Sequence, residues 1–481
     1  MGQTLRPWKT IIPLALDGDK AVYQQIADGI IMEIKRGRLK PGTPLPGTRI
    51  LAEDLGVNRK TVVLAYEGLL DEGWLESIPK KGTFISEKLP VQTGFTKQNN
   101  TAKQPVAKPS LAEVAPKPLI VFNDGLPDVR LAPMEELARA YKRIFQQKVR
   151  WRMLGYGSER GDERLRSALT SMLSHDRALS IDNDGICVTR GSQMALYLTA
   201  HTLLKRGDVV AVEDPGYAAA WRTFENAGAK LLPVQVDEQG ICTETLEKIC
   251  RRKKLKAVYV TPHHQFPTTV SMKADRRMHL LQLANKYGFY IIEDDYDHEY
   301  HFGIRSLLPL ASNGQTANNV IYISSLSKLI APSVRIGYIA GPPSFIDGVA
   351  ALRLMIDRQG DTVMEQAIAE LMEDGEIRRH AKRAYTVYAS RRKQMAFLID
   401  SYLANKVTYK MPEGGLAYWL TINHPTDTGK LNKKLLQKGV SIIPTEPFSF
   451  HKTGLSAIRL GYASLTQEEM EAGFQILGAQ L

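Results

Sequence analysis

Short apolar runs alternate with longer segments of mixed polarity through the second half of the chain, and this alternation constrains the fold more than any other feature. The runs are residues 186–189, 209–212, 257–260, 289–292, 320–323 and 336–340. Each run is rich in Val, Ile, Tyr or Ala, which is typical of a buried strand. Strands that alternate with helices predict an α/β domain with a mainly parallel sheet, whose site lies where the strands end.

A lysine and an acid stand at the ends of two of these runs. Lys328 closes the segment Ser324-Ser325-Leu326-Ser327-Lys328, and the preceding run, Ile291-Ile292-Glu293-Asp294-Asp295-Tyr296, ends in acids and a phenol. A pyridoxal phosphate site requires an amine to form the imine, a carboxylate to keep the ring nitrogen protonated, and Ser and Arg side chains for the phosphate. The pattern predicts such a site, and a solvated lysine is the alternative for Lys328.

Two further segments follow predicted strands at the same edge of the sheet. Gly191-Ser192-Gln193 opens a helix directly after a strand, so its backbone N–H groups and the helix N-terminus suit a phosphate. Tyr217, in Glu213-Asp214-Pro215-Gly216-Tyr217, offers a ring that can stack on an aromatic cofactor, with core packing as an equal alternative. The acid and the lysine favour the cofactor interpretation for both segments.

Residues 1–90 have a different pattern, which predicts helices joined by short turns. Apolar residues recur at helical spacing in residues 21–36, and the helix stops at a glycine. A short helix is expected at residues 48–55 and another at 58–72, with Asn58 as the N-cap of the second. Two helices joined by a short turn that contains Gly are typical of a helix-turn-helix.

A hairpin with a basic tip follows these helices. Residues 74–77 and 82–86 predict its two strands, and Lys80 and Lys81 lie between them, where they suit phosphate or minor-groove contacts. The whole chain carries a formal net charge of +12, which permits a nucleic-acid partner. Residues 1–90, however, hold 13 Lys and Arg against 11 Asp and Glu. The placement of the cations therefore carries the DNA-binding interpretation, against the alternative of a solvated surface.

The rest of the sequence sets the domain boundaries and the protein class. Residues 88–118 lose apolar periodicity and collect Pro with Gln, Asn, Thr and Lys, which predicts a linker between a head at 1–87 and an effector domain at 119–481. No apolar run reaches the ~18 residues of a membrane span. The three cysteines have neither a disulfide framework nor metal-ligand spacing. We therefore expect a cytoplasmic protein with reduced thiols, without a metal and without membrane contact.

The head resembles the GntR-type winged helix-turn-helix over nearly its full length. The resemblance rests on Leu45-Pro46-Gly47-Thr48-Arg49 and on Gly56-Val57-Asn58-Arg59-Lys60-Thr61-Val62. In that family the arginine of the first segment and the start of the recognition helix contact DNA. The resemblance thus implies double-stranded promoter DNA as a partner, contacted by Arg49, Arg59, Lys60 and Thr61.

The second half resembles fold type I pyridoxal phosphate enzymes of the aminotransferase class. The whole chain resembles MocR-type regulators, in which a GntR head is fused to such a domain. The resemblance implies a large, mainly parallel sheet domain and a small α+β C-terminal subdomain. It makes Lys328 the Schiff-base lysine and Asp294 the partner of the pyridine nitrogen. Arg459, in Ile458-Arg459-Leu460-Gly461-Tyr462, becomes the clamp for an effector carboxylate.

The same resemblance assigns the other contacts of the cofactor. Tyr217 would stack on the ring, and Tyr296 would face the phenolic oxygen. The phosphate would be bound by Ser192, Gln193, Ser325, Ser327 and Arg335.

One departure from aminotransferases of this fold bears on function. Those enzymes usually carry Asn-Pro after the strand that corresponds to residues 257–260, and the Asn bonds the phenolic oxygen of the cofactor. Here Phe266 precedes Pro267 and cannot form that hydrogen bond. MocR-type regulators show the same aromatic residue, although they commonly have Gly where this chain has Thr269. Loss of the Asn should weaken turnover, which favours sensing over catalysis.

We therefore predict a transcriptional regulator that binds pyridoxal phosphate on Lys328, senses an amino compound by transimination and forms a head-to-tail homodimer. Its target genes would belong to amino-compound or vitamin B6 metabolism, with at most weak transaminase activity. Two alternatives stay open: an active aminotransferase with an appended DNA-binding domain, and a regulator that responds to pyridoxal phosphate alone. The basic stretch at residues 376–393 is either a solvated face or an auxiliary surface for the DNA backbone.

Overall fold

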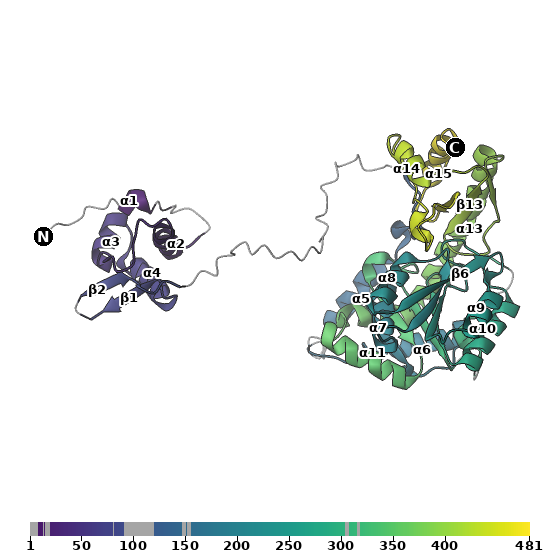
Figure 1. Ribbon diagram of the computed structural model, residues 1–481, viewed down its shortest axis with the longest axis horizontal. Helices are drawn as coiled ribbons and strands as arrows, with labels where there is room; N and C mark the ends of the chain where they lie inside the picture. Colours follow the sequence, from purple (N-terminus) through teal and green to yellow (C-terminus); the bar gives the residue numbers. More distant parts are fainter. Residues whose placement is uncertain are drawn as a thin grey trace. The chain divides into compact units, whose positions relative to one another are not determined.

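The computed structural model describes residues 8–12, 14, 20–79, 81–90, 120–146, 151, 155–303, 307–314 and 318–481. The chain divides into two compact units, residues 1–110 and 111–481, which we call unit 1 and unit 2 (Figure 1). Most of the predicted linker, residues 88–118, lies outside the described residues. Within the described ranges, no helix combines the length and the apolar composition that a membrane crossing requires.

Unit 1 consists of short helices followed by a hairpin (Figure 1). Its elements are α1 (Trp8–Ile11), α2 (Val22–Lys35), α3 (Thr48–Leu55), α4 (Arg59–Asp71), β1 (Leu75–Ile78) and β2 (Gly82–Ile85). Apolar residues at helical spacing, such as Ile26 in α2 and Val62 in α4, meet in one core. The Asn58 side chain caps α4 by accepting a hydrogen bond from the Lys60 backbone N–H at 2.9 Å. The predicted helix-turn-helix and hairpin are confirmed, whereas α1, which buries Trp8 in this core, was not predicted.

Unit 2 is built on an eight-stranded sheet with the order β4-β11-β10-β9-β8-β5-β6-β7. The strands are β4 (Ile186–Thr189), β5 (Val209–Asp214), β6 (Lys230–Asp237), β7 (Gly240–Ile241), β8 (Ala257–Val260), β9 (Tyr290–Asp295), β10 (Val320–Ser325) and β11 (Gly337–Ala340). Of these strands, β11 and β7 run in the direction opposite to that of the other six. The mainly parallel sheet is confirmed; β6 was not predicted, because Lys230 and Gln235 interrupt its apolar pattern.

Helices cover both faces of this sheet (Figure 1). They are α5 (Met134–Gln146), α6 (Glu163–Arg177), α7 (Ser192–Leu203), α8 (Ala218–Asn226), α9 (Thr243–Cys250), α10 (Ala274–Tyr287), α11 (Pro343–Ile356) and α12 (Thr362–Glu373). On one face, α7, α8 and α11 pack against strand residues such as Ile292 and Ile323. On the other, α9 and α10 pack against Ile291, and α5, α6 and α12 pack against Tyr322. Both faces are therefore buried, as in other parallel sheets.

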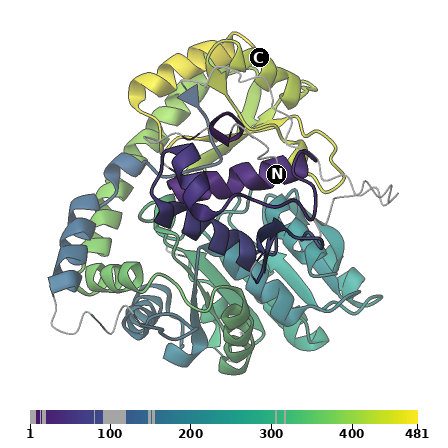
Figure 2. The ribbon, with the colours of Figure 1, turned by 90° about the vertical axis from the view of Figure 1, so that its left-hand side faces the viewer.

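The C-terminal part of the chain, joined by one short strand from residues 120–121, forms a smaller α+β layer, whose C-terminal elements are coloured from light green to yellow in Figure 2. Its elements are β3 (Ile120–Val121), α13 (Glu376–Leu403), β12 (Val407–Tyr409), β13 (Ala417–Ile422), α14 (Thr428–Leu436), β14 (Val440–Ser441), β15 (Ala457–Gly461) and α15 (Gln467–Gly478). Strands β12, β13 and β15 form an antiparallel sheet. The long helix α13 buries Ile377 in the core of the large sheet and Met395 in the core of this layer, so it joins the two.

Candidate functional site

A cavity lies at the C-terminal ends of β8, β9 and β10, where parallel sheets place their ligand sites. Its lining consists of Asp124, Ser192, Tyr217, Tyr259, Thr261, Phe266, Asp294, Tyr296 and Lys328. The fold thus brings together Ser192, Tyr217, Asp294, Tyr296 and Lys328, which the sequence had singled out for one cofactor. It also places Phe266, the residue that departs from the aminotransferase pattern, in the same wall.

Burial governs the ionisation of the acid and the amine in this cavity. Burial raises the pKa of Asp294 to about 7, against the lowering effect of the hydrogen bond that Tyr259 donates to Oδ2 at 2.8 Å. Oδ1 of Asp294 has no hydrogen-bond partner among the described residues. Burial also lowers the pKa of Lys328, whose Nζ lies 4.5 Å from the ring centre of Tyr296. An amine that deprotonates readily and a carboxylate oxygen without a donor fit the aldehyde and the ring nitrogen of pyridoxal phosphate.

Hydroxyl groups and a helix start gather between β4, β10 and β11. The sheet register places Ser325 opposite Gly337, and the Ser325 hydroxyl donates to Oγ of Ser327 at 2.9 Å. Gly191 caps the N-terminus of α7 with a φ of 84°. The Arg335 side chain packs so closely on Gly191 that a Cβ there would lie 2.9 Å from the guanidinium. This arrangement suits a phosphate, because hydroxyl donors, the Arg335 cation and the N-terminus of α7 meet at Gly191, which has no side chain.

Two of the predicted contacts have partners of their own in the structure. The exposed Gln193 side chain donates to Oγ1 of Thr223 at 2.9 Å, which leaves its backbone N–H in the first turn of α7 for a phosphate. The Tyr296 hydroxyl donates to the backbone oxygen of His264 at 2.7 Å, and its oxygen keeps the capacity to accept a hydrogen bond. A cofactor would therefore meet an already oriented Tyr296.

Aromatic rings form one wall of the cavity, and Arg459 of the small layer, which is not itself part of the lining, packs against one of these rings. The rings of Tyr217 and Phe266 meet edge to face with 5.2 Å between their centres. Arg459, on β15, stacks its guanidinium 4.7 Å from the Phe266 ring centre. Its Nε donates to the backbone oxygen of Asp124 at 3.0 Å and its Nη1 to that of Pro267 at 2.6 Å. A carboxylate bound here would share Arg459 with two backbone carbonyls.

Several side chains that shape the site were missed by the sequence analysis. Tyr259 lies inside an apolar strand, and a signal was available because a buried tyrosine hydroxyl needs a partner. Glu213 accepts hydrogen bonds from the Thr261 hydroxyl at 2.7 Å and from Nε2 of Gln265 at 3.2 Å, and burial raises its pKa to about 7. Asp124 comes from the start of unit 2, and no local pattern marks it.

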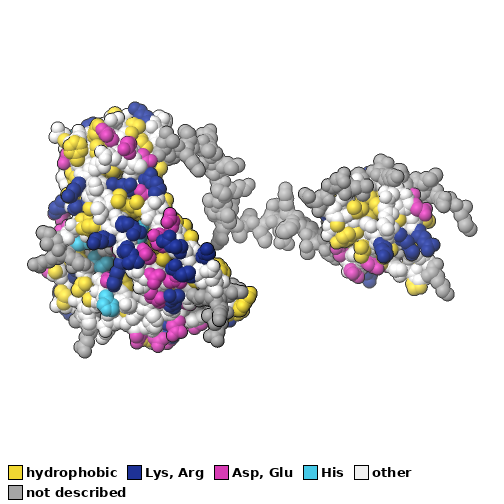
Figure 3. All heavy atoms as spheres, turned by 180° about the vertical axis from the view of Figure 1, so that it is seen from behind, with side chains coloured by type: hydrophobic (Ala, Val, Ile, Leu, Met, Phe, Trp, Pro, Cys, Tyr) yellow, Lys and Arg dark blue, Asp and Glu magenta, His cyan; other side chains and the backbone are white. Residues whose placement is uncertain are grey.

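The predicted DNA contacts of unit 1 lie at the starts of two helices and on the hairpin. Those that the structure describes are Arg49, Arg59, Lys60, Thr61 and Lys81. All are exposed except Thr61, which is half-buried, and Nε of Arg59 lies 3.5 Å from Oγ1 of Thr48, across the two helix starts. Lys80 lies outside the described residues. Figure 3 shows a cluster of Lys and Arg side chains on the face of unit 1 that it displays.

The basic stretch at residues 376–393 lies on α13, and several of its cations have structural partners. Arg378 pairs with Asp176 at 2.9 Å, and Arg391 pairs with the buried Asp128 at 2.8 Å. Nε of Arg392 donates to a backbone carbonyl oxygen. These contacts favour the structural interpretation of the stretch over a surface that binds the DNA backbone.

Comparisons with known proteins match each unit to its own family. The family model of aminotransferase class I and II matches residues 118–477. The model of bacterial regulatory proteins of the gntR family matches residues 22–85.

The most similar proteins include a regulator that aligns with both units. The chain is 30% identical over 478 residues to the probable rhizopine catabolism regulatory protein MocR of Rhizobium meliloti, covering 97% of this chain and 95% of that protein. The structure of this chain matches that of the multiple substrate aminotransferase of Thermococcus profundus with a TM-score of 0.71 and 28% identity. The match covers 75% of this chain and 90% of that one. The structure also matches that of LysN, the alpha-aminoadipate aminotransferase of Thermus thermophilus, complexed with N-(5'-phosphopyridoxyl)-L-leucine, with a TM-score of 0.70, 27% identity, and coverage of 75% and 91%.

Proposed function

Because the chain belongs to the MocR-type regulators, in which a GntR-type head is joined to a domain of the aminotransferase class I and II family, we propose that unit 2 holds pyridoxal phosphate and senses an amino compound. The observation that carries this proposal is the juxtaposition of Lys328 and Asp294 in one buried cavity. Unit 1 would bind promoter DNA, and the ligand that occupies the cavity of unit 2 would determine how unit 1 binds that DNA.

Each residue of the cavity has a distinct task in this proposal. Bound pyridoxal phosphate supplies an electrophilic carbonyl carbon that condenses with amines. Lys328 is the amine of the protein, and its lowered pKa supplies the unprotonated form. Asp294 holds a proton at the ring nitrogen through Oδ1, while Tyr259 fixes the other carboxylate oxygen. Ser325, Arg335 and the start of α7 hold the phosphate.

The wall at Phe266 supports sensing over turnover. A phenyl ring offers the cofactor no hydrogen bond, and here it meets the Tyr217 ring edge to face and packs against the guanidinium of Arg459. An amino compound that carries a carboxylate would compete for Arg459 with the carbonyls of Asp124 and Pro267. Such a ligand shifts the protein between states only by its differential affinity for them, and that shift would be transmitted to DNA binding.

A second copy of the chain is part of the proposal. Leu354, Met355 and Ile356 expose large apolar side chains at the end of α11, with 77% of Met355 accessible. Consecutive exposed apolar residues are typical of an interaction surface. We propose a head-to-tail homodimer, whose two heads would require two half-sites on DNA.

An active aminotransferase with an appended DNA-binding domain is the second candidate. It is favoured by one observation: Lys328 and Asp294 line the same cavity, and Arg459 packs against Phe266 of its wall. Such an enzyme would convert an amino acid and a 2-oxo acid through many turnovers. A sensor would give a lasting spectral change without accumulating product, and a regulator that responds to the cofactor alone would give no change with amines.

The experiment is an absorbance titration of the full-length protein with pyridoxal phosphate, beside Lys328→Ala. We expect a visible band in the wild type that is absent from Lys328→Ala, because the band requires the covalent link to that amine. Lys286→Ala, which removes an exposed lysine of α10, should behave as the wild type. An equal band in Lys328→Ala would contradict the assignment of the lysine. Candidate amines are then added, and DNA binding is measured in parallel by fluorescence anisotropy.

A further inference from the structure

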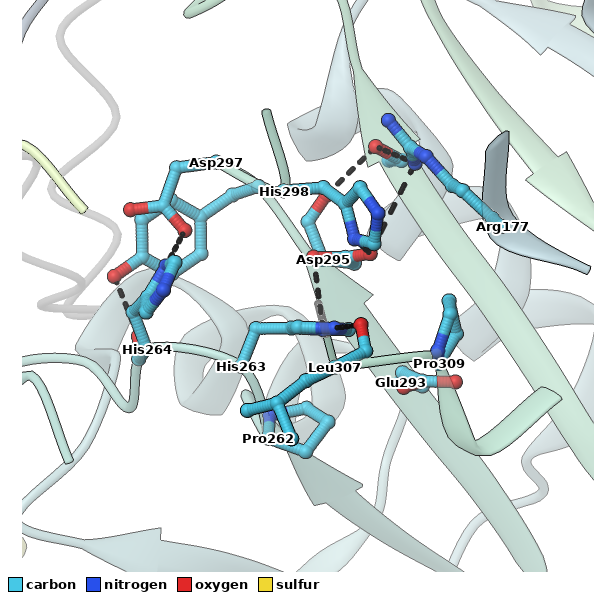
Figure 4. A network of polar contacts seen from close by, with 12 residues as sticks. Arg177, Pro262, His263, His264, Glu293, Asp295, Asp297, His298, Leu307 and Pro309 are labelled. Atoms are coloured by element: carbon cyan, nitrogen blue, oxygen red, sulfur yellow. Dashed lines mark hydrogen bonds and ion pairs between the residues drawn. The ribbon is translucent and has the colours of Figure 1, made fainter. Parts of the chain in front are cut away.

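Two histidines and an aspartate form a buried cluster on the sheet face opposite the cofactor cavity (Figure 4). Successive residues of a strand point to opposite faces, so Asp294 of β9 lines the cavity whereas Asp295 points away from it. Asp295 meets His263, from the segment after β8, and His298, from the segment after β9. The side chains of His263, Asp295 and His298 are 3%, 0% and 10% exposed, respectively.

The three residues aim potential metal-ligand atoms at one another. Nδ1 of His263 lies 3.2 Å from Oδ1 of Asp295, and Nδ1 of His298 lies 3.0 Å from Oδ2. One ligand atom from each residue falls within 4.8 Å of the others. Zn²⁺ binds His nitrogen at ~2.0–2.1 Å and carboxylate oxygen at ~2.0–2.2 Å, so tetrahedral ligand atoms are separated by about 3.3 Å. The spacing of the cluster is therefore close to that of a metal site.

The hydrogen-bond pattern around His263 places the proton of the neutral ring on its outer nitrogen, Nε2. Nε2 of His263 lies 2.6 Å from the backbone oxygen of Leu307, which can only accept, so Nε2 carries the hydrogen. In the neutral ring, Nδ1 then carries a lone pair, which faces Oδ1 of Asp295. Nδ1 of His263, Nδ1 of His298 and Oδ1 of Asp295 have no hydrogen-bond partner among the described residues. A histidine whose outer N–H is held by a backbone carbonyl is also the usual arrangement of a metal ligand.

The charges around the cluster leave room for a cation. Arg177 lies 3.8 Å from Asp295 but also pairs with Glu299 and donates to the Tyr322 hydroxyl. Arg277 also interacts with Asp295 and with the buried Glu293. Three carboxylates therefore face two guanidinium groups, and one negative charge remains to be balanced when all three carboxylates are ionised. Either a proton on His263 or a bound metal ion can supply that balance. The Asp295 carboxylate opposes the effect of burial and raises the pKa of His263, which makes the protonated ring the competing explanation.

A route for an ion exists beside the cluster. A cavity of about 520 Å³ is lined by residues that include Arg177, His298, Glu299 and His301. It shares no lining residue with the cofactor cavity, so an ion and its remaining water ligands can reach His298 without crossing the cofactor cavity.

We propose that His263, Asp295 and His298 bind a divalent transition-metal ion of the Zn²⁺ class, with solvent from the neighbouring cavity completing its coordination. Two imidazole nitrogens and one carboxylate oxygen suit Zn²⁺ and similar first-row ions and disfavour Ca²⁺ and Mg²⁺, which prefer oxygen ligands. Because Asp295 follows Asp294 directly in β9 and His298 lies in the turn just after that strand, the ion would hold the segment that carries Asp294 and Tyr296. The proposal does not depend on pyridoxal phosphate being bound.

The test measures zinc on the untagged full-length protein, treated with EDTA, dialysed and supplied with ZnCl₂. We expect the wild type to retain about one zinc per chain by elemental analysis. His263→Ser and His298→Ser each remove one ligand, and we expect at least ~10-fold weaker binding in competition with a chromophoric chelator. His279→Ser, on α10 and outside the cluster, is the matched control and should bind as the wild type does. Circular dichroism verifies that each variant is folded.

Two outcomes would overturn the metal site. One is a folded wild type that binds Zn²⁺ no more tightly than the two cluster variants, which would leave the protonated His263 as the balancing charge. The other is an equal loss of zinc in His279→Ser, which would indicate nonspecific binding to surface histidines. Parallel titration with MgCl₂ and CaCl₂ checks the ligand class, and binding of either ion at the same site in preference to Zn²⁺ would also contradict the proposal.

Discussion

At the scale of single residues, two adjacent acids of β9 take different surroundings because a strand turns successive side chains to opposite faces. Asp294 lies in the cavity with Lys328 and accepts a hydrogen bond from Tyr259. Asp295 lies among histidines on the other face. The resemblance implied Asp294 as the partner of the cofactor, and the geometry places that residue, not Asp295, in the lining of the cavity.

The raised pKa of Asp294 makes stability depend on pH in the cofactor-free protein. Its pKa rises from 3.8 to about 7 on folding, so between these values the folded state binds more protons than the unfolded state. The free energy of unfolding therefore falls as the pH rises through this window, by about 1.4 kcal/mol for each pKa unit at most. We expect the melting temperature to fall between about pH 4 and 7.

Asp294→Asn should flatten this dependence, measured by differential scanning calorimetry without cofactor. Glu213→Gln should flatten it in part, because burial raises the pKa of Glu213 in the same direction. Glu471→Gln removes an exposed carboxylate and should leave the slope unchanged. A slope that persists in Asp294→Asn with the size seen in the wild type would contradict the assignment.

At the scale of elements, the first residues of helix α4 determine where the helix begins and which side chains its start presents. Asn58 caps the helix through the Lys60 backbone N–H, and the same turn presents the exposed side chains of Arg59 and Lys60. On the inner face, Tyr66 donates its hydroxyl to the backbone oxygen of Pro46, which holds α4 against the turn before α3. The element that would read DNA is thus positioned by a cap and by one buried hydrogen bond.

Asn58→Ala should destabilise unit 1 by about 1 kcal/mol, because one N–H of the first turn loses its acceptor. We expect weaker binding to promoter DNA as well, since the helix start carries the predicted contacts. Asn58→Asp keeps a capping oxygen and should retain stability. Denaturant unfolding followed by Trp fluorescence measures the first effect and anisotropy the second. Unchanged stability in Asn58→Ala would show that the cap is dispensable.

At the scale of the whole molecule, the proposed regulator requires a second chain as well as two units. Unit 2 buries both faces of its sheet, yet it leaves the apolar end of α11 accessible. A homodimer would cover such a surface and present two heads to DNA.

Met355→Arg should disrupt self-association with little effect on the fold of the single chain, because this side chain is largely exposed. We expect a shift from dimer to monomer in sedimentation velocity, and a loss of affinity for DNA with two half-sites. Met278→Arg, on α10, is the matched control, since it also changes an exposed methionine. If Met355→Arg sediments as the wild type does, the dimer surface lies elsewhere.

Much of the fold and of the cavity could be predicted from the sequence alone, because the signals that indicate them are local. Apolar runs predicted the sheet, helical spacing and Asn58 predicted the helices of unit 1, and Lys328 with Asp294 predicted the cavity. Only the tertiary structure decided which distant residues meet. Asp124 and Tyr259 line the cavity. His263 lies beside Asp295 and His298 in a cluster that the spacing of cysteines and histidines in the sequence did not indicate. Periodicity reports what each segment buries, whereas a site depends on the packing of segments that are far apart in the chain.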